Sequence, residues 1–161
     1  MHMGSEAIEM VGHGFFFEDL PVGRRFRTIG RTLYEADLMA FVHCTGYGEV
    51  LFTDSEFVKR ESDIKGRLVP AAMILSVIDG LVLQYTAQHT GFAFLDCEMK
   101  VHGPTFVGDT IHAVCEVVEA RRSKSKPGRG IVRTRNDVHN QDGKLVLSYT
   151  PARWMKARTT G

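Results

Sequence analysis

The chain has little cysteine and almost no excess of charge, and both absences exclude classes of function. Its 161 residues contain only three cysteines, Cys44, Cys97 and Cys115, which lie far apart. Because no CxxC motif or paired Cys/His cluster is present, the sequence predicts no metal site, and it favours reduced thiols in a cytoplasmic protein. The formal net charge of +1 gives no global field that would attract nucleic acid or an anionic membrane.

A long hydrophobic run is also missing. The longest apolar stretch, residues 68–83, is interrupted by a proline, a serine, an aspartate and a glycine. A membrane-spanning helix needs about 20 mostly apolar residues, so we expect a buried helix here and no membrane partner. Residues 1–14 lack the basic and apolar regions of a signal peptide. We expect them to be a flexible tail before a single domain at residues 15–161.

Apolar periodicity predicts an α+β domain. Residues 25–33 have the composition of a first strand, and residues 35–44 have a helical spacing of apolar residues. Thr32 and Glu35 match a capping box at the start of that helix. A further helix, from Ala71 to about Gln88, is apolar nearly all round, so we expect other structure to surround it.

The rest of the chain predicts four consecutive strands. The first has an apolar set, Leu95, Cys97, Met99 and Val101, that alternates with polar residues, which predicts one wet and one dry face. The other three strands are expected at residues 111–117, 131–139 and 144–155, with a hairpin turn at Asp142-Gly143. One N-terminal strand, a long apolar helix and four antiparallel strands describe a hot-dog fold, in which a curved sheet wraps around the central helix.

Short motifs in a fixed order resemble the MaoC-like acyl-CoA hydratase/dehydratase family. They are Phe17-Glu-Asp-Leu-Pro-Val-Gly23, Gly30-Arg-Thr-Leu-Tyr-Glu-Ala-Asp37, Phe41 through Thr45-Gly46, Thr53-Asp54, Gly66-Arg67 and Pro104-x-x-x-Gly-Asp-Thr110. The resemblance covers nearly the whole chain from Phe17 onward. It implies activity on enoyl or 3-hydroxyacyl thioesters, no cofactor other than the coenzyme A (CoA) of the substrate, and a homodimer or higher homo-oligomer formed through the sheets.

The resemblance breaks at the catalytic pair. The family uses an Asp and a His five residues apart, and these positions correspond to Tyr47 and Phe52. Phenylalanine has no titratable group, and an ordinary tyrosine keeps its proton near neutral pH. Glu49 lies between the two positions and is the best substitute carboxylate, although a solvated loop glutamate would look the same. Asp54 either contacts substrate or caps a short helix.

The electrophilic half of the family's site is a helix N-terminus placed against the thioester carbonyl. The resemblance places Pro70, Ala71 and Ala72 in that turn, where backbone N–H groups aligned with the helix dipole would bind the carbonyl oxygen. An ordinary helix start would have the same sequence.

The only basic cluster runs from Arg121 to Arg129. The family binds CoA, so Arg121, Arg122, Lys124 and Arg129 are candidates for its phosphates, and a solvated hairpin loop is the alternative. The cluster lacks interleaved aromatic residues, so the sequence predicts no nucleic-acid partner.

Three functions remain open at this point. The first is a (de)hydratase that uses Glu49 with the Ala71 and Ala72 amides. The second is a hot-dog thioesterase in which Asp79 or Glu49 activates water, and the third is a non-catalytic acyl-thioester binder or structural subunit. The missing Asp/His pair favours the third on chemical grounds, and the resemblance favours the first.

Overall fold

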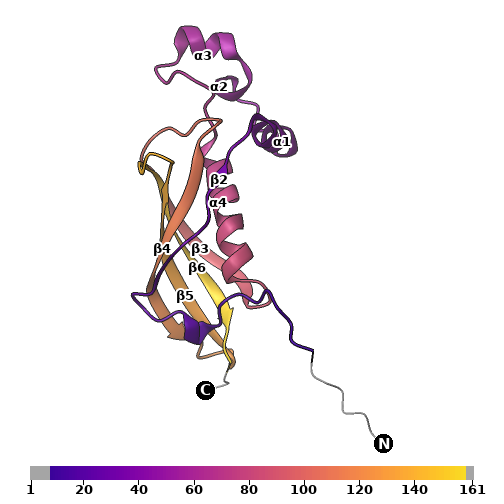
Figure 1. Ribbon diagram of the computed structural model, residues 1–161, viewed down its shortest axis with the longest axis vertical. Helices are drawn as coiled ribbons and strands as arrows, with labels where there is room; N and C mark the ends of the chain where they lie inside the picture. Colours follow the sequence, from indigo (N-terminus) through magenta and orange to yellow (C-terminus); the bar gives the residue numbers. More distant parts are fainter. Residues whose placement is uncertain (1–7, 159–161) are drawn as a thin grey trace, which may run out of the picture.

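A computed structural model describes residues 8–158. They form a curved antiparallel sheet with one long helix along one face (Figure 1). The sheet order is β1-β4-β5-β6-β3, and β2 pairs with β4 off this path. The predicted α+β class is therefore confirmed. The strands are β1 (Arg25–Arg27), β2 (Arg31–Thr32), β3 (Gly91–Val101), β4 (Thr110–Arg122), β5 (Arg129–His139) and β6 (Leu145–Lys156).

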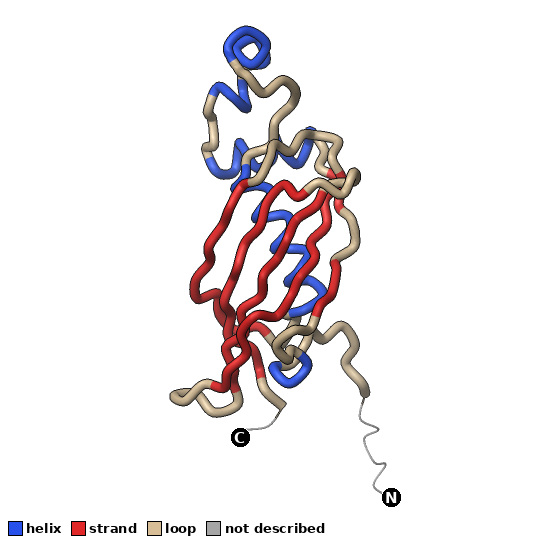
Figure 2. The backbone as a smooth tube through the Cα atoms, turned by 90° about the vertical axis from the view of Figure 1, so that its left-hand side faces the viewer, coloured by secondary structure: helices blue, strands red, loops and turns tan. Residues whose placement is uncertain are grey.

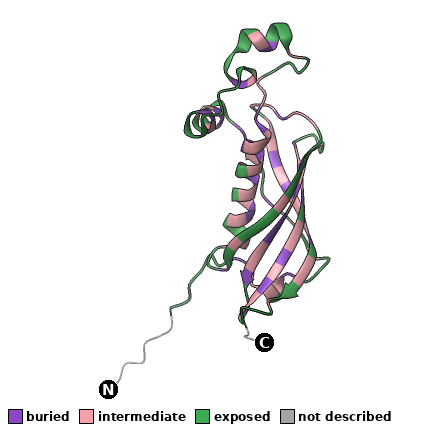
Figure 3. Cartoon of the chain, turned by 180° about the vertical axis from the view of Figure 1, so that it is seen from behind, coloured by how far each residue is buried: buried purple, intermediate pink, exposed green. Residues whose placement is uncertain are grey.

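The long helix, α4 (Ala71–Thr86), packs one side on the sheet and leaves the other open. Its buried residues follow a helical spacing: Met73, Ile74, Ile78 and Val82. On the other flank Ser76, Gly80 and Gln84 are exposed (Figure 3). The prediction that other structure surrounds this helix is wrong for a single chain, because the sheet covers only one side of it. A β-carbon added at Gly80 would meet no atom within 4 Å.

The strand β3 forms an open edge of the sheet. It pairs with β6 on one side only, so the other side presents unpaired backbone groups. Within the apolar set predicted to be dry, Leu95, Met99 and Val101 are 42%, 44% and 50% exposed, and only Cys97 is half-buried. The predicted dry face is therefore wrong for a single chain, and apolar surface lies along a strand edge.

Three short helices lie together beyond one end of the sheet, near the start of α4 (Figures 1 and 2). They are α1 (Glu35–Thr45), α2 (Val50–Thr53) and α3 (Ser55–Glu61), and a 3-10 turn, η1 (Phe17–Asp19), precedes β1. Arg67 joins two of the helices. Its Nε lies 3.0 Å from both carboxylate oxygens of Glu35 in α1, and its Nη1 donates to the carbonyl of Phe52 in α2.

The start of α1 differs from the predicted capping box. The N–H of Tyr34 donates to the Asp37 carboxylate at 2.9 Å, so Asp37 takes the role expected of Glu35. Thr32 belongs to β2, and its hydroxyl shares a hydrogen bond of 2.7 Å with Thr110 on β4. The predicted box is wrong because sheet pairing takes the Thr32 side chain.

The segment that leads into β1 closes the far end of α4. The N–H groups of Gly14 and Phe15 donate to the carbonyls of Gln88 and Thr86, each at 2.8 Å. These bonds satisfy carbonyls that a helix end would otherwise leave free. Residues 1–7 of the predicted tail lie outside the described part of the chain.

Candidate functional site

An aromatic cluster occupies the two positions that the resemblance aligns with the catalytic Asp and His of MaoC-like enzymes. The ring of Tyr47 lies 5.7 Å from that of Phe52 and 5.7 Å from that of Phe41. Phe52 is buried, and Tyr47 is 41% exposed. The Tyr47 hydroxyl has no hydrogen-bond partner within residues 8–158, so it is available to donate to a ligand. Neither side chain supplies a base.

Two acidic residues lie on the same segment of the chain and differ in their contacts. Glu49 precedes α2, and its backbone carbonyl accepts from the Phe52 N–H at 2.9 Å. Its carboxylate is exposed and has no partner among the residues described. Asp54 instead accepts from the N–H groups of Glu56 and Phe57 at 2.9 and 3.0 Å. Asp54 is thus the N-cap of α3, and Glu49 is the free carboxylate of the pair.

The first turn of α4 offers free backbone donors. The buried Pro70 is the N-cap, and its carbonyl accepts from Met73 and Ile74 at 3.0 and 3.1 Å. The N–H groups of Ala71 and Ala72 find no acceptor in the described part of the chain. Such groups carry the positive end of the helix dipole. These N–H groups are therefore free to donate to a ligand, and any ordinary helix start would offer the same donors.

The carboxylate of Asp79, on the sheet-facing side of α4, contacts two residues of β6. Both of its oxygens lie 2.6 Å from Nη2 of Arg153, and Oδ1 accepts from the Tyr149 hydroxyl at 3.1 Å. Burial raises the pKa of Tyr149, so that hydroxyl stays a donor. Because these contacts occupy its carboxylate, Asp79 is a structural ion-pair partner and is not free to act as a base.

Sequence reasoning missed Arg153, although a signal was present. On β6 the alternate residues Leu147, Tyr149 and Pro151 are buried, and Arg153 is next in that series. A cation on a buried strand face needs a partner, and the carboxylate within the apolar helix, Asp79, is the matching charge.

The basic cluster lies in the hairpin between β4 and β5, at the end of the sheet away from α1–α3 (Figure 1). Arg121 bonds Glu119 at 2.9 Å and Arg122 bonds Glu18 at 2.7 Å, whereas Lys124 is exposed. The 16 residues of α4 span about 24 Å. One chain therefore does not bring this hairpin to the Ala71 turn.

Residues 8–158 hold neither a cluster of metal ligands nor a membrane-spanning helix. No group of three or more His, Cys, Asp or Glu side chains there could hold a metal ion. Within the same residues, each helix is too short or too polar to cross a bilayer.

Comparison with known proteins identifies the fold. No family model and no curated protein sequence matches the chain. Among solved structures, it is 28% identical to a monoamine oxidase regulatory protein from Archaeoglobus fulgidus, over 92% of this chain and 99% of that one, with a TM-score of 0.80. It is also 28% identical to a MaoC-like dehydratase from Rhodospirillum rubrum, over 90% and 99% of the chains, with a TM-score of 0.78.

The chain has the hot-dog fold of the MaoC-like dehydratases. A Mycobacterium tuberculosis protein with a double hot-dog fold is likewise similar, at 27% identity and a TM-score of 0.81. The match covers 92% of this chain and 46% of that one, a length that fits one of its two hot-dog units. The predicted hot-dog fold and the predicted likeness to MaoC-like dehydratases are confirmed.

Proposed function

We propose that the protein is a MaoC-like (de)hydratase that adds water to enoyl-CoA thioesters or removes it from 3-hydroxyacyl-CoA thioesters. The likeness to a MaoC-like dehydratase over nearly the full length of both chains supports this proposal. The two free amides of Ala71 and Ala72 support it further. In this reaction negative charge develops on the thioester oxygen, and preorganised N–H donors stabilise such charge.

Glu49 is the base in this proposal, and its unpartnered carboxylate is the observation that carries it. The reaction needs a group that takes a proton from water, and Tyr47 and Phe52 do not provide one. Glu49 lies between them in sequence, on the segment between α1 and α2, at the same end of the molecule as the start of α4 (Figure 1). The Tyr47 hydroxyl would then orient the water or the carbonyl.

A non-catalytic acyl-thioester binder or structural subunit is the second candidate. The packing of Tyr47 against Phe41 and Phe52 favours it, because the cluster fills the family's catalytic positions with apolar rings. A thioesterase that uses Asp79 is disfavoured, since Arg153 and Tyr149 already bind that carboxylate.

We further propose a homodimer formed edge to edge through β3. A long apolar strand edge is a template for pairing with another chain. Phe92, Phe94, Leu95, Met99 and Val101 on this strand are each more than 40% exposed. A second copy would cover them and continue the sheet. The cytoplasmic location remains a prediction of the sequence alone.

Incubation with crotonyl-CoA distinguishes the candidates. Loss of enoyl absorbance without free thiol indicates hydration, thiol release indicates hydrolysis, and binding with neither indicates a binder. We expect hydration in the wild type and none in Glu49→Gln, with CoA binding retained. Glu56→Gln, an exposed glutamate on α3, is the control and should keep the wild-type rate. A wild-type rate in Glu49→Gln would eliminate Glu49 as the base.

A further inference from the structure

The guanidinium of Arg67 uses all three of its nitrogens on two helices near the candidate site. Its Nε lies 3.0 Å from both carboxylate oxygens of Glu35 on α1, and its Nη2 lies 2.6 Å from Oε1 of the same residue. Its Nη1 donates to the backbone carbonyl of Phe52 in α2. A guanidinium presents its donors in a rigid planar fork. The side chain therefore fixes α1 and α2 relative to each other in both distance and direction.

The backbone around Arg67 pairs with the loop before β4. The Arg67 carbonyl accepts from the Val107 N–H, and the Val69 N–H donates to the Thr105 carbonyl, each at 2.9 Å. The next residue, Pro70, is the N-cap of α4. The segment that carries the guanidinium therefore also sets the position of the first turn of α4.

A short series of hydrogen bonds leads from Arg67 to Glu49. Arg67 donates to the Phe52 carbonyl, and the Phe52 N–H donates to the Glu49 carbonyl at 2.9 Å. Glu49 is the N-cap of α2, which has only four residues. So short a helix has little stability of its own, and its orientation depends on its contacts. Arg67 thus orients the turn that carries the Glu49 side chain.

Side-chain packing restrains α2 on one side only. Phe52 is buried in the core, whereas Leu51 lines a cavity of about 230 Å³. The other residues around this cavity are Ser55, Val58, Lys59, Gly66 and Arg67. Empty space offers no van der Waals contact, so the hydrogen bonds of Arg67 supply a restraint on this side that packing does not.

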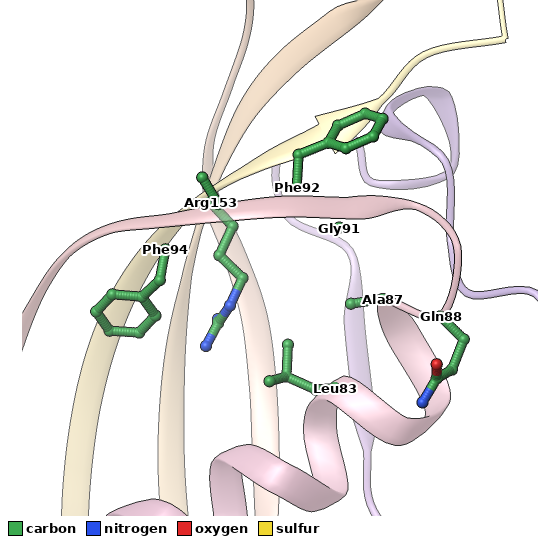
Figure 4. A pocket seen from close by; sticks show the side chains of 8 residues that line it. Leu83, Ala87, Gln88, Gly91, Phe92, Phe94 and Arg153 are labelled. Atoms are coloured by element: carbon green, nitrogen blue, oxygen red, sulfur yellow. The ribbon is translucent and has the colours of Figure 1, made fainter.

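The arginine at the opposite end of α4 is engaged differently. A cavity of about 390 Å³ lies at that end, beside β3. Its walls include Phe92 and Phe94, and Arg153 reaches into it from β6 (Figure 4). The dimer proposed through β3 would cover both rings, and Arg153 already binds Asp79. Of the two arginines, Arg67 is the one beside the candidate site.

We propose that Arg67 is a positioning residue, which holds the Glu49 turn in a fixed place relative to the Ala71 and Ala72 amides. It acts through the Phe52 carbonyl and does not touch the substrate. The inference rests on the proposed function, because the Glu49 carboxylate and these amides would act on different atoms of one thioester. A misplacement of about 1 Å between such groups can slow a reaction about a hundredfold.

Arg67→Met tests this role, because it removes the donors and keeps an unbranched side chain. We expect kcat for the hydration of crotonyl-CoA to fall about tenfold or more. The KM should change by less than about twofold, since no substrate contact is removed. Arg67 and Glu35 have side chains that are 34% and 52% exposed. Exposed ion pairs contribute about 0–1 kcal/mol to stability, so we expect the variant to fold.

Two further variants show whether the arginine fork itself is needed. Arg67→Lys keeps the charge but places it on one nitrogen, which does not bridge two helices as the fork does, so we expect it to recover little of the lost rate. Arg135→Met is the matched control, because Arg135 on β5 also binds a glutamate, Glu116, at 2.8 Å, and it should keep the wild-type kcat. A wild-type kcat in Arg67→Met, or full recovery in Arg67→Lys, would overturn the inference.

Hydrogen exchange, followed by NMR, tests the bridge without any substrate. The N–H groups of Phe52 and Asp54 are bonded within α2, each at 2.9 Å. We expect both to exchange about tenfold faster or more in Arg67→Met, and at wild-type rates in Arg135→Met. The amides of β6, a strand paired on both sides, should exchange equally in all variants. Unchanged exchange in α2 would reject the bridge, and faster exchange in β6 as well would reject a local role.

These assays separate the inference from the proposed function. A wild type that never hydrates crotonyl-CoA rejects the (de)hydratase, and hydrogen exchange alone then decides whether Arg67 holds α2. A wild type that hydrates crotonyl-CoA at a rate that Arg67→Met does not change rejects the positioning role and keeps the (de)hydratase.

Discussion

Removal of the Asp79 carboxylate should destabilise the protein strongly. Asp79 and Arg153 have side chains that are 17% and 11% exposed, with N–O distances of 2.6 Å. In Asp79→Ala the guanidinium stays nearly buried without its counter-ion, and the Tyr149 hydroxyl, on a residue only 1% exposed, loses its acceptor. Both groups were largely desolvated on folding, and the variant leaves both without their partner.

The expected loss follows from that burial. Breaking a buried pair by removing one partner costs about 3–5 kcal/mol, and for a domain of this size each kcal/mol lowers the melting temperature by about 2–4 °C. We therefore expect a decrease of roughly 6–20 °C for Asp79→Ala. Replacing both partners, as in Asp79→Leu/Arg153→Met, should recover most of the loss, because no charge is then left unpaired.

Urea unfolding and calorimetry measure the effect. Glu56→Ala is the matched control, since Glu56 and its partner Lys59 on α3 have side chains that are 63% and 69% exposed, and its loss should be far smaller. A loss below about 1 kcal/mol for Asp79→Ala would refute the reasoning, because a pair of that value is screened by solvent.

Two further predictions concern the contact between Glu35 and Arg67 and the exposed edge strand β3. The hydrogen bonds of Arg67 lower the pKa of Glu35 from its ordinary 4.5, so their stabilisation is present above that pH and is lost as the pH falls through the lowered value. In urea unfolding, the gap in stability between wild type and Glu35→Gln should therefore narrow from neutral pH to about pH 3, and a constant gap would argue against the contact. At the edge, Met99→Lys should convert the dimer to a monomer in light scattering, whereas Val22→Lys, an exposed apolar position outside β3, should not. A dimer that survives Met99→Lys would show that the interface lies elsewhere.

Features fixed by neighbouring residues were predictable from the sequence. The predicted strands after α4 overlap β3 to β6, and the turn at Asp142-Gly143 joins β5 to β6, because alternation and turn chemistry act within a few residues. Asp54 caps α3 for the same reason. By contrast, α2 has four residues, which is too few to show a helical period.

Features that depend on distant segments were not predictable. Thr32 looked like a helix cap, and its hydroxyl pairs instead with Thr110, 78 residues away. The apolar residues of α4 and β3 were correctly located, but their burial depends on how far the sheet extends, which no local pattern contains. At the candidate site, the resemblance located Tyr47 and Phe52, whereas the partner of Asp79 lies 74 residues away on β6.

The direction of β3 determines which parts of two copies would meet in a dimer. This strand runs back along α4 after a short turn at residues 87–90, so it starts beside the C-terminal end of the helix and ends near its first turn. Antiparallel pairing of β3 with itself would set the end of one strand beside the start of the other. In such a dimer the last turn of α4 in one copy and the first turn of α4 in its mate would lie at the same end of the assembly.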